Sequence, residues 1–89
     1  MGERTAPRRI TNTIRALRFL HGEMTQAALG EQIGLTRQTV AAIEAGKYSP
    51  SLEAAFRIAE VFGKRPDEVF RWEPVEPSRK KSRIARTSD

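Results

Sequence analysis

Two adjacent residues with several hydrogen-bonding groups, Arg37 and Gln38, stand at the start of a short segment with helical spacing. An arginine guanidinium presents a fork of donors that matches guanine O6 and N7, and a glutamine amide can pair with adenine through two hydrogen bonds. Free backbone amides at the start of a helix also favour phosphate groups. The pair therefore indicates contact with the edges of bases and with the phosphates beside them.

The small residues that follow, Ala41 and Ala42, permit two interpretations. They could let the helix backbone approach a duplex closely, with a methyl group meeting the methyl group of thymine. They could equally be there because alanine is a good helix former. We include both among the candidate base-reading residues and leave the two explanations open.

Residues for other kinds of chemistry are sparse. The chain has no cysteine and a single histidine, His21, so a thiolate metal site is excluded and a nucleophile with its base is hard to assemble. A metal site needs several ligands, and we expect His21 to be a polar surface or capping group. We expect no catalytic residue, metal or cofactor; a small enzyme is the disfavoured alternative, which turnover by the purified protein would revive.

The chain of 89 residues has the length of one small domain with tails. Its net charge of +5 lies mostly in the arms: residues 1–9 carry three arginines against one glutamate, and residues 73–89 carry five basic groups against three acidic ones. Such arms could follow phosphates or could be solvated tails. No apolar run could span a bilayer, and the first residues lack the apolar core of a signal peptide. We expect a cytoplasmic protein, associated with the nucleoid when bound to DNA, and no membrane partner.

Helical spacing dominates the chain, and no segment alternates polar and apolar residues as a strand does. We expect five helices, over about 11–22, 26–34, 37–45, 52–62 and 66–71, with Thr25, Thr36 and Ser51 as N-caps. The apolar stripe of the first helix is expected to contain Ile14, Leu17 and Leu20. That of the fourth is expected to contain Leu52, Ala55, Phe56, Ala59 and Phe62. We expect a flexible basic arm over 1–9, a domain over 10–72 and a disordered basic tail over 73–89.

The link at Gly34 and Leu35 is so short that the second and third helices must cross steeply. Such a pair can lay its second helix in the major groove of DNA. The segment MTQAALGEQIGLTRQTVAAIEAGKYSPSLEAAFRIAEVFGKRPDEVF resembles the Cro/repressor-type (xenobiotic-response-element class) helix-turn-helix transcriptional regulators, especially the small stand-alone bacterial members. The motifs that carry the resemblance are Thr-Gln opening helix two, Arg-Gln-Thr opening helix three, Ile-Glu-x-Gly-Lys closing it, and the Pro-Ser-Leu that follows.

This resemblance implies an all-α, five-helix, lambda-repressor-like domain that binds double-stranded DNA as a homodimer on a palindromic operator. It assigns contacts with base edges to Arg37 and Gln38, and an ion pair between helices one and three to Arg18 and Glu44. The residues expected at the DNA backbone are Gln26, Thr36, Thr39, Lys47 and Tyr48.

Two residues depart from the family pattern. Gly30 stands where the family more often has alanine, at the close contact between helices two and three. Arg65 stands where a capping serine is common, so we expect a weakly started fifth helix. Of the adjacent pair Phe19 and Leu20, one is expected to be exposed, as a partner surface or without a role.

The end of the domain is the expected dimer interface, formed by Val69, Phe70 and Trp72. The alternative is that Phe70 closes the core and Trp72 packs loosely over it. The expected function is that of a dimeric repressor that inserts the third helix into the major groove. An antitoxin that regulates its own operator and also binds a toxin is the alternative, with a restriction–modification controller as a neighbouring possibility.

Overall fold

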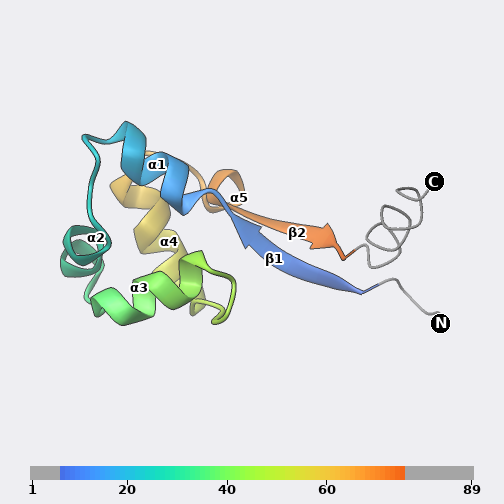
Figure 1. The fold of residues 1–89 in the computed structure, drawn as a ribbon. Helices are drawn as coiled ribbons and strands as arrows, with labels where there is room; N and C mark the ends of the chain where they lie inside the picture. The colour runs from blue at the N-terminus through green and yellow to red at the C-terminus, as the bar shows by residue number, and fades with distance from the viewer. Residues whose placement is uncertain (1–6, 76–89) are drawn as a thin grey trace, which may run out of the picture.

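The computed structural model describes residues 7–75, and the expectations for residues 1–6 and 76–89 lie outside the described part. The described residues form a bundle of five short helices with an antiparallel two-stranded ribbon. The helices are α1 (Ile14–Leu20), α2 (Gln26–Ile33), α3 (Arg37–Glu44), α4 (Leu52–Val61) and α5 (Pro66–Val69), and the strands are β1 (Arg8–Asn12) and β2 (Phe70–Pro74). The five-helix domain is thus confirmed, and Figure 1 shows the ribbon leaving the bundle on the side away from α2.

The expectation that the chain contains no strand is wrong. In the ribbon, Ile10 lies opposite Trp72 and Asn12 lies opposite Phe70. The first and fifth helices are accordingly shorter than expected, because residues 11–12 and 70–71 belong to the strands. The ribbon also continues past the expected domain boundaries, since residues 8–9 and 73–74 are paired with each other.

Local capping fixes the starts of the helices as the sequence predicts. The hydroxyl groups of Thr25, Thr36 and Ser51 each accept a hydrogen bond from the backbone amide three residues later, at 2.9, 3.1 and 3.0 Å. Arg65 provides no side-chain cap to α5, but its backbone amide donates to the Glu68 carboxylate at 2.7 Å. This bond satisfies an amide that would otherwise have no partner within the helix.

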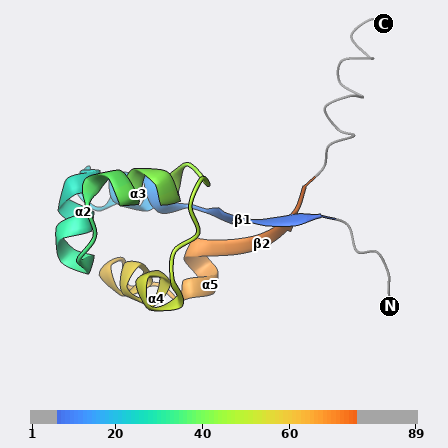
Figure 2. The same ribbon diagram turned by 90° about the horizontal axis from the view of Figure 1, so that it is seen from below.

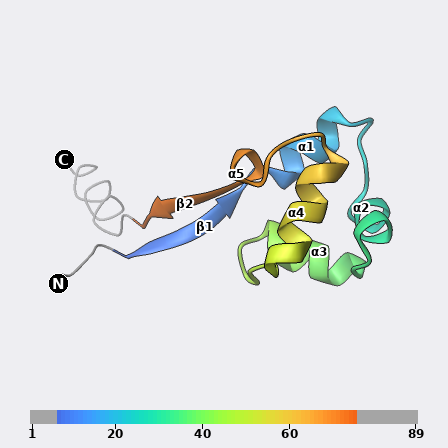
Figure 3. The same ribbon diagram turned by 180° about the vertical axis from the view of Figure 1, so that it is seen from behind.

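The core lies among the helices and is formed by Ile14, Leu17, Leu29, Ile33, Val40, Ile43, Ile58, Ala59, Phe62 and Val69. Figure 2 shows α3 and α4 in two layers, and Figure 3 shows the ribbon and α2 at opposite ends of the molecule.

Two of the expected apolar stripes are wrong in part. Leu20, Leu52 and Phe56 are 74%, 75% and 54% exposed. Leu52 and Phe56 each precede a buried residue of α4 by two positions, Ala54 and Ile58 respectively. Two positions correspond to about 200° around a helix, so these side chains lie on the opposite face. Helix α4 therefore carries apolar residues on two faces, and only one of them packs into the core.

Candidate nucleic-acid interface

The turn between α2 and α3 sets the direction of the third helix. Gly34 ends α2 with a left-handed φ of 80°, a conformation that glycine adopts without steric cost. The amide of Leu35 then donates to the carbonyl of Gly30 at 2.9 Å. The carbonyl oxygen of Leu35 lies so close to Gly30 that a Cβ atom there would overlap it. The glycine at position 30 therefore belongs to the tight crossing of the two helices.

The two candidate base readers stand at the free end of this helix. Arg37 and Gln38 are the first two residues of α3, and both are exposed. Within residues 7–75, neither side chain is hydrogen-bonded to another protein group, so their donors and acceptors are available to a ligand. Ala41 and Ala42, farther along the helix, are half-buried.

The residues predicted to contact the DNA backbone differ in the hydrogen bonds that they already make within the protein. The hydroxyl of Thr36 caps α3 and lies 3.0 Å from the hydroxyl of Thr39. Gln26 donates its side-chain amide to a carboxylate oxygen of Glu44 at 2.6 Å, which leaves one N–H and the carbonyl of the amide for other partners. Lys47 and Tyr48, in the loop that follows α3, are exposed. Contact of these residues with phosphate stays a prediction.

A half-buried ion pair anchors the last turn of α3. Nη2 of Arg18 donates to both carboxylate oxygens of Glu44, at 3.1 and 2.9 Å, and Nη1 donates to the carbonyl of Met24 at 2.7 Å. The two charged side chains are only 16% and 10% exposed. The ion pair that the family resemblance implies between the first and third helices is therefore present, and Gln26 extends it to α2.

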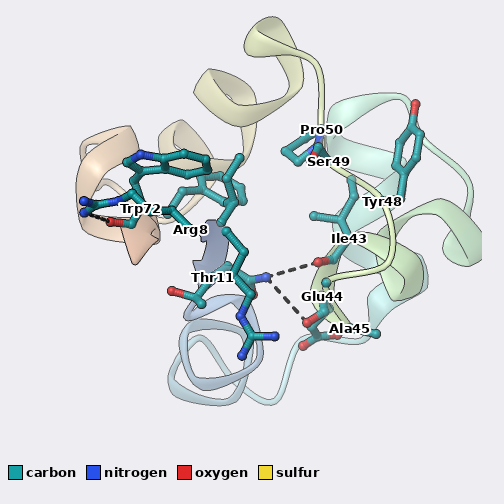
Figure 4. A pocket seen from close by; sticks show the side chains of 14 residues that line it. Arg8, Thr11, Ile43, Glu44, Ala45, Tyr48, Ser49, Pro50 and Trp72 are labelled. Carbon is teal, nitrogen blue, oxygen red and sulfur yellow. Dashed lines mark hydrogen bonds between the residues drawn. The ribbon is translucent and has the colours of Figure 1, made fainter. Parts of the chain in front are cut away.

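A cleft of about 460 Å³ separates the ribbon from the end of α3 and the loop that follows it. Figure 4 shows Trp72 and Arg8 on its ribbon side, with Tyr48, Ser49 and Pro50 across from them. Trp72 is 60% exposed, and the Arg8 guanidinium lies over its ring, 5.9 Å from the centroid. Sequence reasoning missed the contribution of β1 to this region, although Ile10 is an apolar residue in an otherwise polar segment.

The three residues expected in a dimer interface do not share one surface. Val69 is fully buried in the core, so its side chain cannot contact a partner, and its assignment is wrong. Phe70 is half-buried, and Trp72 is exposed. Helix α5 ends at Val69, which turns inward, and the chain then enters β2. The change from helical to strand geometry separates Val69 from the two aromatic residues.

His21 makes contacts of a structural kind. Its Nδ1 lies 3.2 Å from the Leu17 carbonyl oxygen, and its ring meets Phe62 edge-on with centroids 5.0 Å apart. Within the part of the chain that the structure describes, no group of three or more His, Cys, Asp or Glu residues is placed to hold a metal ion. None of the helices there is long and apolar enough to cross a membrane.

Known proteins share both the sequence and the fold of the bundle. A helix-turn-helix family model matches residues 14–69. An uncharacterized HTH-type transcriptional regulator of Methanocaldococcus jannaschii is 45% identical over 65 residues, which cover 73% of this chain and 97% of that protein. The uncharacterized regulator YgzD of Bacillus subtilis is 48% identical over 59 residues, covering 66% and 88%.

The crystal structure of a presumed DNA-binding protein from Bacteroides fragilis has the same fold, with a TM-score of 0.60 at 24% identity, over 70% of this chain and 98% of that one. The family match runs from the first residue of α1 to the last residue of α5, so it contains the whole helical bundle and stops short of both strands. The chain belongs to the Cro/repressor-type helix-turn-helix family of DNA-binding transcriptional regulators.

Proposed function

We propose that this regulator represses transcription by occupying a palindromic operator as a homodimer, with α3 of each copy in the major groove. The observation that carries the proposal is the exposed Arg37–Gln38 pair at the leading end of α3, with no protein partner for either side chain in residues 7–75. A guanidinium and an amide placed there can each form two hydrogen bonds with a base edge.

The other end of α3 supports the same placement. Lys47 and Tyr48 are exposed in the loop after α3, three and four residues beyond its last residue. The eight residues of α3 span about 12 Å, which is close to the width of the major groove. A helix in the groove would then bring its leading end to the bases and the following loop to a phosphate at the groove's edge. Phosphate contacts of this kind orient a protein but carry no sequence information.

A second copy of the chain is the proposed occupant of the exposed ribbon face. Trp72 and its cross-strand partner Ile10 are both exposed there, beside the half-buried Phe70. These side chains adjoin the cleft at the end of α3, so a two-fold axis near them would leave both reading ends directed away from the partner. The two-fold symmetry of such a dimer would match the symmetry of a palindromic site.

Base reading is tested by selecting bound duplexes from a random pool and then measuring dissociation constants for the selected duplex and for a random one. Arg37→Ala should weaken binding to the selected duplex by about fivefold to 150-fold, because a good bidentate contact gives about 1–3 kcal/mol of discrimination. Its affinity for random duplex should change little. Lys47→Ala is the matched comparison: it should weaken both complexes alike and reduce the salt slope by about one. Equal losses on both duplexes for Arg37→Ala would reject its role as a reader.

Dimerisation is tested by sedimentation equilibrium over a range of protein concentrations. Trp72→Ser should shift the protein toward the monomer, because it removes a large apolar side chain from the proposed interface. Phe19→Ser is the control, since Phe19 is comparably exposed, at 65%, but lies on α1. A wild-type protein that remains monomeric at all concentrations, or an identical response to both substitutions, would exclude this interface.

One observation favours the antitoxin alternative. Apolar side chains are exposed on helices that the proposed DNA contacts do not use: Phe19 and Leu20 on α1, and Leu52 and Phe56 on α4. A protein partner could cover either surface. A second small chain that co-purifies with this protein, and whose toxicity the protein suppresses, would establish that function.

A further inference from the structure

We infer that Asn12 is a positioning residue that ties the last turn of α3 to the ribbon and thereby sets the direction of Arg37 and Gln38. The inference rests on the proposed function of α3 as the base-reading helix. It concerns a residue that lies outside the region matched by the family, which begins at residue 14.

The Asn12 side chain joins two helix ends. Its Nδ2 donates to the carbonyl of Ile43 at 3.1 Å and, more weakly, to that of Glu44 at 3.5 Å (dashed lines in Figure 4). Its Oδ1 accepts from the amide of Ile14 at 3.1 Å. The last carbonyls and the first amides of a helix have no partner within the helix. One amide group therefore caps the C-terminal end of α3 and the N-terminal end of α1.

Three elements meet at the last residue of α3. The carboxylate of Glu44 accepts from Arg18 of α1 and from Gln26 of α2, while Asn12 of β1 holds the backbone at the same turn. The first turn has its own cap from Thr36 and follows the tight turn against Gly30, but within residues 7–75 no side chain of another element is hydrogen-bonded to it. The side-chain hydrogen bonds from other elements thus hold the recognition helix at the end away from Arg37 and Gln38.

Because of this arrangement, the direction of the Arg37 and Gln38 side chains depends on how α3 is held at Glu44. A tilt of about 5° at Glu44 would move the first turn, about 12 Å away, by about 1 Å. Hydrogen bonds weaken steeply with distance and angle, and a binding group must be held within about 0.5 Å of its working position. A flexible lysine can still reach a phosphate after such a shift. Loss of the Asn12 contact should therefore reduce discrimination between sequences more than general affinity for DNA.

Two substitutions separate this contact from the cap of α1. Asn12→Ser keeps a hydroxyl acceptor near the Ile14 amide but has no donor that reaches the end of α3. Asn12→Asp also keeps an acceptor and loses both N–H donors. Thr11→Ala is the control on the same strand, because none of the side-chain hydrogen bonds to α3 comes from Thr11.

The experiment measures dissociation constants at one salt concentration, for a duplex selected from a random pool with the wild-type protein and for a random duplex. Circular dichroism verifies that each variant is folded. Asn12→Ser and Asn12→Asp should weaken binding to the selected duplex by about threefold to tenfold, the effect of one net hydrogen bond. Binding to random duplex should stay within about twofold, and Thr11→Ala should match the wild type on both.

A purely structural role would weaken both complexes alike. An unchanged ratio of the affinities for the selected and the random duplex, in both Asn12 variants, would therefore overturn the inference. A pool that returns no preferred sequence would instead refute the proposed function, and the inference with it. Selection with Asn12→Ser adds an independent readout, because a helix free to tilt should recover a less sharply defined sequence.

Discussion

Replacing Glu44 with glutamine should destabilise the protein far more than its modest chemical change suggests. The substitution keeps the shape of the side chain and one acceptor oxygen, but it removes the charge opposite the Arg18 guanidinium. That guanidinium is only 16% exposed, and its Nε atom is already buried without a partner in the described structure. The remaining hydrogen bond to the carbonyl of Met24 does not neutralise the positive charge.

The size of the loss follows from this burial. Breaking a buried ion pair by removing one partner costs about 3–5 kcal/mol, because the other charge is left without compensation. We expect the lower end, about 3 kcal/mol, because Arg18 keeps its Met24 contact and some access to solvent. A domain of this size has a total stability of about 5–15 kcal/mol, and each kcal/mol shifts its Tm by about 4–8 °C. The Tm of Glu44→Gln should therefore fall by about 12–24 °C.

Urea denaturation followed by circular dichroism measures the change in the free energy of unfolding. Glu53→Gln provides the matched control, because Glu53 also pairs with an arginine, Arg57, at 2.8 Å, but the two side chains are 73% and 52% exposed. Exposed pairs of this kind contribute about 0.3–0.5 kcal/mol. If the free energy of unfolding falls by a similar amount in the two variants, burial does not determine how much the Arg18–Glu44 pair stabilises the protein, and the prediction is refuted.

Two further predictions concern the ends and faces of helices. Thr36→Ala should destabilise the protein by about 0.5–2 kcal/mol in urea denaturation, because it removes the N-cap of α3; an unchanged midpoint would show that the cap contributes nothing. Phe56→Ser should change stability by less than about 0.5 kcal/mol at concentrations where the chain is monomeric, whereas Ile58→Ala should cost about 2–5 kcal/mol. A large loss for Phe56→Ser would contradict the exposure of that side chain.

The helix-turn-helix could be predicted from the sequence because its signals are local. Thr25, Thr36 and Ser51 cap helices through amides only three residues away, and Gly34 marks a turn that its own conformation defines. The ribbon is different. Its strands are far apart in the sequence, before the first helix and after the last one. Each has only five residues, so neither contains the long alternation that identifies a strand. The ribbon forms because the two strands pair with each other, and the pattern of residues within one strand cannot show that pairing.

Apolar residues at two places lie differently from what their sequence pattern predicts. The spacing of Leu52 and Phe56 fits a helix, but α4 has apolar residues on two faces, and spacing alone cannot show which face turns inward. Val69, Phe70 and Trp72 are close in sequence, which favours one shared surface. The change from helix to strand directly after Val69 sends its side chain into the core, while Trp72 stays exposed.

The composition of α3 explains why its anchoring should matter for recognition. Ala41 and Ala42 in the middle of α3 are half-buried and Ala45, directly after its last residue, is exposed, and each of these can offer only a methyl group to a duplex. In the proposed mode, discrimination then depends largely on Arg37 and Gln38, the two long side chains of the first turn. A helix with many readers can lose the alignment of one and retain its preference for a sequence. A helix with two readers loses much of its preference when either one is misaligned, so the specificity of α3 should depend on the rigidity of its last turn, at Glu44.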